Sequence, residues 1–524
     1  MSILIFILVF YVLLSISLMN LFKKAGKNPI DALIPGKNFY VWTQIIGQPK
    51  YWALWLLFPI VNIFIFVGMC VDMVRSFGKY DFWHSALSVI YAPLAFFKIG
   101  YGKENYVGPT VILEHEYKDK ITDAITKKDE YNLKKLDQAN PYKKGGVREW
   151  FESIFFAVFA AAFIRMFLIE AYVIPTSSME GSLLVGDYLF VSKAHYGIRM
   201  PMTVLQLPLL HNRIPFFDKE SYLKSPSLPY FRLPKIQDVQ RFDPVVFNYP
   251  EGDSVFVTPQ RNFTIHDIRR SPGLIMRIPP ENQEMAVRPI DKKDHYIKRC
   301  IGLPGDNLKI VNRQVFINDK AIENPKNLQY TYKVVAPNGL NMSRLNEWGI
   351  NINDVNPAEG IFSLSEENLA RVRSLSPDIS VSILTPDNPG RDYLFPHDDA
   401  NFFGWTIDNY GPIHIPKKGE TVDLNLKNIA MYQLAIRVYE NNTLEIKDDK
   451  IFINGVNVNN YTFKQDYYWM MGDNRHNSED SRIWGFVPED HIVGKPLFIW
   501  FSTKNVNWKE GIRWDRILTG ATKM

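Results

Sequence analysis

Three short stretches of this 524-residue sequence contain residues whose types and spacing could carry out chemistry. The first is a hydroxyl-rich turn in which Thr176, Ser177 and Ser178 stand directly before a methionine. The second places Lys298 among residues typical of a β-strand, and the third is the polar loop 471–488. A neutral amine can take the proton of a serine hydroxyl and so activate it as a nucleophile, with no need for a histidine or a metal ion.

The sequence around Lys298 favours a lysine that loses its charge. Side chains alternate between the two faces of a strand, so Tyr296, Lys298 and Cys300 share one face. Arg299 projects from the other face of the strand, where it can have a structural role. Loss of hydration on an apolar face lowers the pKa of a lysine. A lysine in a strand is more commonly a solvated surface residue, so the serine–lysine interpretation depends on the other two stretches.

The residues that must position these groups, 171–524, have the pattern of a mainly β domain. Runs of β-branched and aromatic residues recur between Gly, Pro, Asn and Asp, which indicates strands separated by turns. The clearest runs are 188–192, 245–249, 295–301 and 497–501. Two helices interrupt the pattern. Ser365 can cap one that runs to about Ser374. Asn425 can cap another that runs to about Glu440.

Two segments of this domain, 308–318 and 444–454, share a pattern of apolar positions. Each predicts a strand, a polar turn and a second strand. Duplication and independent origin both explain the similarity. The segment between them, about 325–443, is predicted to be an α+β insertion into the β domain.

Four apolar segments near the N-terminus are candidate membrane-spanning helices, because about 20 apolar residues cross a bilayer as a helix. They are 4–22, 52–71, 82–97 and 151–169. A cleavable signal peptide is the alternative for the first, but no basic residue precedes the apolar run and no small-x-small site follows it. Pro59 is a candidate kink in the second. The third is short and contains His84, so a buried or re-entrant segment is its alternative.

Positive charges between these segments predict their orientation. Lys and Arg number five in 23–51, two in 74–81 and eleven in 98–150. Positively charged loops tend to stay in the cytoplasm, so we expect four crossings, with everything after about residue 170 outside. The expected parts are an N-terminal membrane region with about three spanning helices (1–100), a charged cytoplasmic segment (101–149), a transmembrane anchor (150–170) and an extracytoplasmic β domain (171–524).

The charged segment 101–149 carries both signs and a thin apolar stripe. This pattern predicts a solvated helix that ends at Asn140–Pro141. A partner-binding helix is the alternative.

Charge balance and cysteine content argue against several classes of protein. With 60 Lys and Arg against 55 Asp and Glu, the net charge of +5 gives no support for nucleic-acid binding. The two cysteines, Cys70 and Cys300, cannot form a disulfide scaffold or a cysteine-rich zinc site. They are expected on different sides of the membrane boundary, so they cannot pair. No metal ion or other cofactor is predicted.

In their order along the chain, the three stretches and the segment 241–250 together resemble bacterial type I signal peptidase, also called leader peptidase, a family with a serine–lysine dyad. Ser178 before Met179 matches the family's nucleophile. Lys298 in Tyr-Ile-Lys-Arg matches its catalytic lysine. Ser177 is the alternative nucleophile, but the family places the reactive serine next to the methionine.

The resemblance also implies supporting groups. The backbone N–H of Ser178 and the hydroxyl of Thr176 would stabilise the oxyanion of the reaction. Ser478 would orient the lysine. Asp480 and Arg482 would form an ion pair that holds these groups in place.

The resemblance covers about 171–310 and 444–503, together with the preceding anchor. It does not account for the first three membrane segments or for most of 325–443. His476 stands where the family usually has aspartate, and Gly181–Leu183 stands where it usually has Pro-Thr-Leu. The implied fold is a signal-peptidase-like β fold with an inserted α+β segment, preceded by a multi-span α-helical membrane region.

The implied function is that of a membrane-bound serine endopeptidase that removes signal peptides from exported preproteins. It would lie in the inner (cytoplasmic) membrane as a multi-pass protein, with its catalytic domain on the extracytoplasmic (periplasmic) side. Its partners would be preproteins and the lipid bilayer, with the protein translocation machinery as a further candidate and no nucleic acid. Two alternatives stay open: a self-cleaving Ser-Lys regulator, for which no DNA-binding module is visible, and a non-catalytic membrane assembly or chaperone protein on a peptidase fold.

Two further hypotheses concern apolar and thiol side chains near the candidate site. Leu183 and Leu184 could dip into the lipid surface, or they could belong to the core. Cys300 could place a reactive thiol close to Lys298, in which case thiol alkylation would slow cleavage; a buried, inert thiol is the alternative.

Overall fold

The computed structural model divides the chain into two compact units. One comprises Met1–Ile164 with Thr203–Leu228, and the other comprises Arg165–Met202 with Pro229–Met524. The structure describes residues 2–57, 61–143, 146–203, 205–207, 209–210, 212, 214, 220–250, 254–257, 262–264, 272–278, 285–352, 356–385, 393–398, 400–402 and 404–521.

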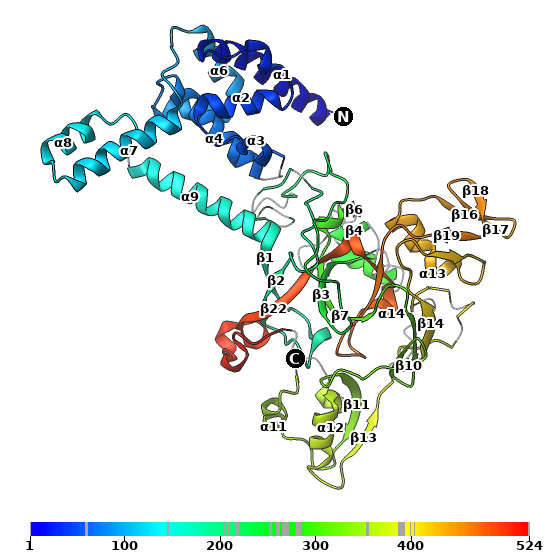
Figure 1. The fold of residues 1–524 in the computed structure, drawn as a ribbon. Coiled ribbons are helices and arrows are strands. Elements are labelled where there is room, and N and C mark those ends of the chain that lie inside the picture. Colours follow the sequence, from blue (N-terminus) through cyan, green and yellow to red (C-terminus); the bar gives the residue numbers. More distant parts are fainter. Residues whose placement is uncertain are drawn as a thin grey trace. The chain divides into compact units, whose positions relative to one another are not determined.

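The N-terminal part of the first unit, up to residue 164, is helical, as its apolar segments predict (Figure 1). Its core buries Leu18, Trp42, Cys70 and Phe96. The helices around this core are α1 (Ser2–Lys24), α2 (Lys37–Ile46), α3 (Trp52–Trp55), α4 (Val61–Ser76), α5 (Phe82–Ile90) and α6 (Ala92–Tyr101). The helix predicted over 4–22 is therefore present.

The third apolar segment is not one helix. The prediction of a continuous helix over 82–97 is wrong, because α5 ends at Ile90 and α6 begins at Ala92. Pro93 explains the break: proline has no N–H to donate and suits the first turn of a new helix. The region 52–71 holds two helices, α3 and α4, and the candidate kink at Pro59 lies outside the described residues.

The fourth apolar segment is helical. The helix α9 (Gly146–Phe163) continues into a π-helical turn, Ile164–Leu168, and the strand β1 begins at Ile169. Within the part of the chain that the structure describes, the segment Glu149–Leu168 is the one helix found to be long and apolar enough to cross a membrane.

The charged segment folds as two helices, α7 (Thr110–Thr126) and α8 (Glu130–Ala139), which lie side by side (Figure 1). The helix end predicted at Asn140–Pro141 is confirmed, since α8 stops at Ala139 with Asn140 in an extended conformation. The Tyr117 hydroxyl donates a hydrogen bond to the Leu136 carbonyl and joins the two helices.

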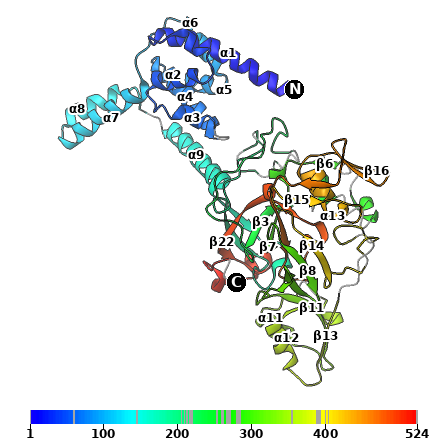
Figure 2. The same cartoon turned by 45° about the vertical axis from the view of Figure 1, so that its right-hand side comes forward.

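The second unit is built on an antiparallel sheet, and the prediction of a mainly β domain is confirmed. Its seven strands follow the order β1-β2-β22-β3-β7-β20-β21. Figure 2 shows β22, β3 and β7 as neighbours in this sheet. The strands are β1 (Ile169–Val173), β2 (Asp187–Ser192), β3 (Pro244–Asn248), β7 (His295–Gly302), β20 (Tyr467–Met471), β21 (Val487–Pro488) and β22 (Ile492–Ser502). Four of these contain the predicted runs.

Both predicted hairpins are present. The first joins β8 (Asn307–Val311) to β9 (Gln314–Ile317), and the second joins β16 (Leu444–Lys447) to β17 (Lys450–Ile453). They belong to different sheets, and duplication and independent origin both still explain the similarity of their sequences.

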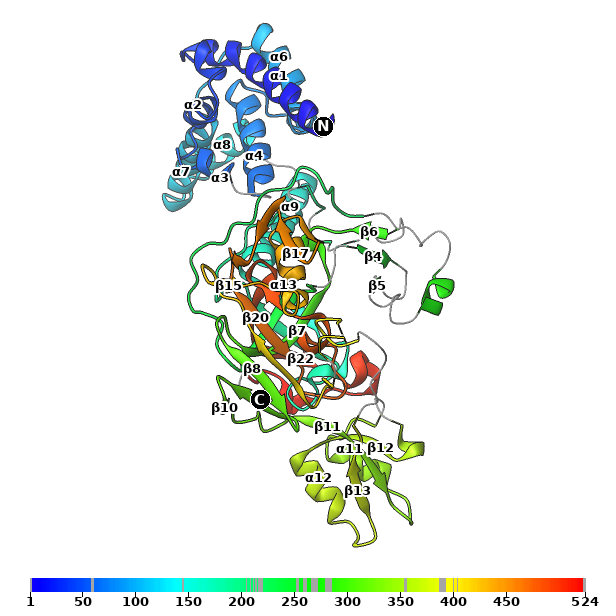
Figure 3. The same cartoon turned by 90° about the vertical axis from the view of Figure 1, so that its right-hand side faces the viewer.

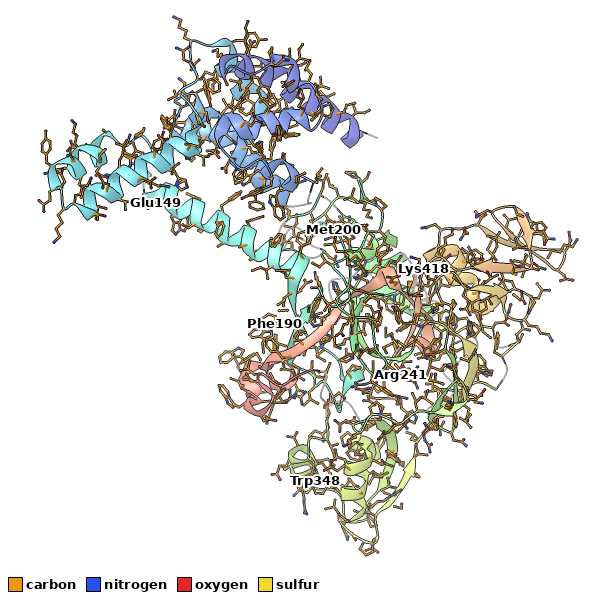
Figure 4. The ribbon with its side chains drawn as sticks, in the orientation of Figure 1. Glu149, Phe190, Met200, Arg241, Trp348 and Lys418 are labelled. Atoms are coloured by element: carbon orange, nitrogen blue, oxygen red, sulfur yellow. The ribbon has the colours of Figure 1, made fainter. Side chains whose placement is uncertain are left out.

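A small α+β part lies between these hairpins in the sequence. Its sheet has the order β12-β11-β13, and α11 and α12 accompany it (Figure 3). Its elements are β11 (Gln329–Val335), α11 (Met342–Glu347), β12 (Ile361–Ser365), α12 (Glu366–Arg373) and β13 (Ser380–Ile383). Ser365 caps α12 as predicted, because its hydroxyl accepts the Asn368 N–H. Figure 4 labels Trp348, over which the Arg344 guanidinium stacks at 5.2 Å.

The helix predicted to begin at Asn425 starts later. It is α13 (Ile429–Leu434), which continues as a π-helical turn, Ala435–Tyr439. The Asn425 side chain accepts the N–H groups of Lys427 and Asn428 and so forms a turn before the helix. An asparagine side chain can cap a helix or form a turn before it, and the sequence alone does not distinguish these two roles.

Candidate active site

Ser178 and Lys298 meet in the second unit. Ser178 lies in a single 3₁₀ turn, Ser177–Met179, that follows β1, and Lys298 projects from β7. The Lys298 Nζ and the Ser178 Oγ are hydrogen-bonded at 2.5 Å, although the two residues are 120 positions apart. This is the contact that a lysine must make to take the proton of a serine hydroxyl.

The surroundings of Lys298 favour its neutral form. Its side chain is almost fully buried, with 3% of the residue exposed, and its Nζ lies 5.9 Å from the centre of the Tyr296 ring. Burial lowers the pKa of Lys298 to about 8, while the negative charge of Asp480 opposes this shift. A substantial fraction of the amine is therefore neutral near physiological pH, as the strand pattern predicts.

The polar loop after β20 packs beside this pair. The backbone N–H of Asn474 donates to the Ser178 carbonyl at 3.1 Å. Further along, Arg482 binds the Asp480 carboxylate through two contacts, of 2.7 and 2.9 Å, and both side chains are buried. Burial raises the pKa of Asp480, but Arg482 and the Gly472 N–H outweigh it and hold the pKa below its ordinary value. The loop thus contains a buried ion pair whose two charges neutralise each other.

Ser478 does not contact the lysine through a hydrogen bond in this structure. Its Oγ is buried and has no hydrogen-bond partner among the described residues. It lies against Gly472, the residue at which the chain leaves β20. The structure therefore brings Ser478 to the candidate site but leaves its hydroxyl unsatisfied, a condition that is costly unless something binds there.

Gly472 has no room for a side chain. A methyl group at this position would lie 2.5 Å from the Ser178 carbonyl oxygen and closer still to the Ser478 Oγ. We expect Gly472→Ala to displace the loop from Ser178 and to lower kcat about 100-fold, because misplacement of reacting groups by about 1 Å has effects of that size. Gly273→Ala is the matched control, since nothing lies within 4 Å of that position. Equal turnover of the two variants on a preprotein substrate would contradict the prediction.

These groups line one cleft of about 790 Å³, a size typical of ligand sites. All four of Thr176, Ser178, Lys298 and Ser478 lie on its wall, and Thr176 is exposed. The wall also includes Asn351, Tyr393 and Ile407 from the segment predicted as an insertion. Sequence analysis did not predict these three residues, because no local pattern marks a loop that reaches a distant cleft. Within the described residues, no group of three or more His, Cys, Asp or Glu could hold a metal ion.

Arg299 serves structure, as its place on the opposite strand face predicts. It binds Asp473 through contacts of 2.7 and 2.5 Å and donates to the Phe242 carbonyl and the Ser182 hydroxyl. Both members of the ion pair are buried. The pair therefore ties the strand that carries Lys298 to the loop that carries Asp480.

We expect Arg299→Met to destabilise the second unit by about 3–5 kcal/mol, because removal of one partner leaves the Asp473 charge buried and unpaired. Denaturant unfolding followed by tryptophan fluorescence measures this change. Arg371→Met is the control: its ion pair with Glu367 is exposed, and its loss should change stability by less than about 1 kcal/mol. Adding Asp473→Leu should recover part of the stability lost in Arg299→Met, and a further loss would contradict the explanation.

The hypothesis of a reactive Cys300 is not supported. The residue is fully buried, burial raises the pKa of its thiol, and its Sγ donates to the Gly302 carbonyl at 3.6 Å. Leu183 is also fully buried, in a core with Met179 and Leu189, so for this residue the core interpretation is correct.

Comparison with known proteins assigns the family. Residues 147–369 and 457–501, just over half of the chain, match the family described as signal peptidase, peptidase S26. Residues 30–109 match a family of unknown function (DUF5684).

Several relatives are signal peptidases. Signal peptidase I of Buchnera aphidicola subsp. Baizongia pistaciae is 25% identical over 388 residues, which cover 72% of this chain and 84% of that protein. Signal peptidase I of Helicobacter pylori is 25% identical over 369 residues, 68% of this chain and 86% of that protein. That of Haemophilus influenzae is 26% identical over 373 residues, 70% of this chain and 74% of that protein. The chain belongs to the signal peptidase family, peptidase S26.

Proposed function

We propose that this serine endopeptidase removes signal peptides from exported preproteins with Ser178 as its nucleophile and Lys298 as its general base. The observation that carries the assignment is the 2.5 Å contact between the Ser178 Oγ and the buried Lys298 Nζ. Burial lowers the pKa of a lysine, so part of its amine is neutral near neutral pH. The neutral amine can take the proton of a serine hydroxyl within hydrogen-bond reach and so activate the serine.

The reaction follows in two stages. The Ser178 Oγ attacks the carbonyl carbon of the scissile peptide while Lys298 accepts the hydroxyl proton. The lysine then returns that proton to the departing amine, and an ester to Ser178 remains. Water attacks this ester with Lys298 again as the base, which restores the Ser178 hydroxyl and releases the signal peptide with a carboxylate end.

Three further roles belong to the proposal. The Ser178 N–H and the Thr176 hydroxyl stabilise the oxyanion of each tetrahedral intermediate. Ser478, whose buried hydroxyl has no hydrogen-bond partner among the residues described by the structure, orients the Lys298 amine once substrate fills the cleft. The ion pair of Asp480 and Arg482 stabilises the loop and so positions Ser478.

We also propose the membrane arrangement of the enzyme. Residues 1–100 form a multi-span membrane region, 101–149 a cytoplasmic segment, 150–170 an anchor in the inner membrane, and 171–524 the periplasmic catalytic domain with an insertion at about 325–443. The apolar helix Glu149–Leu168 supports the anchor. The family match ends at residue 369 and resumes at 457, so 370–456 lies outside it and supports added structure in the domain, whereas 325–369 lies within the match.

Exposed aromatic and apolar side chains after β22 support contact of the catalytic domain with lipid. Trp508, Trp514 and Leu518 are each more than 70% exposed, and tryptophan favours the interface between bilayer and water. The translocation machinery remains a proposed partner of the membrane region.

The experiment that tests the function uses the purified full-length chain in detergent with a radiolabelled preprotein. Mass spectrometry of the products locates the bond that is cut. One cut between the signal peptide and the mature protein is the expected result. An uncut preprotein, under conditions in which a known signal peptidase cuts it, would favour a non-catalytic assembly or chaperone role.

A further inference from the structure

The inserted segment lines the cleft and also contacts the polar loop after β20, which we call the catalytic loop. The backbone N–H of Gln329, at the start of β11, donates to the Asp473 carbonyl at 3.0 Å, and the Gln329 carbonyl accepts the Arg475 N–H at 2.9 Å. These bonds join the inserted segment in parallel to the loop that ends in Ser478 and Asp480. The Phe395 N–H also donates to the Arg482 carbonyl at 2.9 Å.

One side chain of the loop lies between two parts of this segment. His476, whose side chain is 0% exposed, accepts the Thr331 N–H at its Nδ1 at 3.2 Å. The proton of the ring is therefore on Nε2, which donates to the Asp408 carboxylate at 2.9 Å. The Tyr330 ring packs edge-on against the imidazole. Residues of the insertion thus bind both nitrogens of the histidine and pack against its ring.

The loop position matters because Ser478 lies two residues after His476. Its hydroxyl is buried in the site and has no hydrogen-bond partner within the part of the chain that the structure describes, and the N–H of Asn474 binds the Ser178 carbonyl. A shift of the loop would move Ser478 relative to Lys298 and would change the turn that holds Ser178. Asp408, from the same insertion, also contributes its charge to the surroundings of Arg482.

We propose that His476 and Asp408 form a positioning pair through which the inserted segment holds the catalytic loop in its active conformation. The insertion then helps to position the catalytic residues of the active site. The inference rests on the proposed function, since it assigns positioning residues to the same Ser178–Lys298 site. The His476 nitrogens bind Thr331 and Asp408, and although His476 borders the cleft its side chain is 0% exposed, so loss of the pair should lower turnover more than substrate binding.

The test compares variants that remove the hydrogen bonds with one that keeps them. Asp408→Leu removes the acceptor, and His476→Phe keeps the ring while removing both hydrogen bonds. Each is expected to lower kcat about 10- to 100-fold and to leave KM within about threefold. Asp408→Asn retains an acceptor oxygen for His476 and should keep kcat within about threefold of the wild type. Asp378→Asn, an exposed position of the same insertion, is the matched control.

Thermal melting of each variant accompanies the kinetics. If Asp408→Leu or His476→Phe unfolds at the assay temperature, kcat per folded molecule is measured below its melting point. Unchanged kcat in both variants would overturn the proposal. An equal decrease of kcat in Asp408→Asn and Asp408→Leu would also overturn it, as would a rise in KM with kcat unchanged. A wild-type enzyme that cuts no preprotein would count against the proposed function and not against this pairing.

Discussion

Ser178→Ala should abolish processing, with kcat lowered by about 10⁴- to 10⁶-fold, because removal of the nucleophile eliminates the covalent route entirely. The substitution deletes one oxygen, which is hydrogen-bonded to Lys298, so we expect the fold to stay intact. Cleavage of a preprotein by the purified enzyme, followed on gels over hours, measures the residual rate.

Ser177→Ala is the matched control for this variant. The neighbouring hydroxyl is buried and accepts a hydrogen bond of 3.2 Å from Asn477, away from the lysine. Its loss should reduce turnover less than about tenfold, the cost of one ordinary hydrogen bond. An inactive Ser177→Ala beside an active Ser178→Ala would reverse the assignment of the nucleophile.

Lys298→Met should have an effect of similar size, about 10⁴-fold or more, because no other group replaces the base and the serine hydroxyl stays protonated. Methionine fills the same buried volume without a charge, so the melting temperature should not fall. Lys309→Met is the control: that lysine is partly exposed on β8, paired with Asp319, and should be replaceable without loss of activity. Full activity of Lys298→Met would exclude the proposed dyad.

The wild-type enzyme should also show the titration of this lysine. Only the neutral amine accepts a proton, and burial sets the pKa of Lys298 at about 8. Below that pH the amine is protonated, so kcat/KM should fall about tenfold per pH unit, and above it kcat/KM should level off. A rate that stays constant between pH 6 and 8, with the protein folded throughout, would show that Lys298 is not the base.

Local patterns predicted most of what depends on local physics. Alternation of side chains placed Lys298 and Arg299 on opposite faces of β7, and the structure confirms both a buried amine and a structural guanidinium. Hairpins, the Ser365 cap and the end of α8 followed from turn and capping chemistry. Helix boundaries differ from the predictions in several places: Pro93 lies in the first turn of a new helix, Asn425 forms a turn before α13, and the charged segment folds as two helices, α7 and α8, where one was predicted.

The chemical groups of this protein, and the strands and turns that present them, can be predicted from the sequence because they depend on residue type and on neighbours a few positions away. Which of these groups meet depends on the tertiary fold. The contact of Ser178 with Lys298, the Arg299–Asp473 pair and the approach of Asp408 to His476 each join residues far apart in the chain. Such contacts depend on how the sheet and the segment 325–443 pack, and packing is a property of the whole fold. For the same reason, no local pattern in the sequence marked the lack of a partner for Ser478 among the described residues, or the residues of 325–443 on the wall of the cleft.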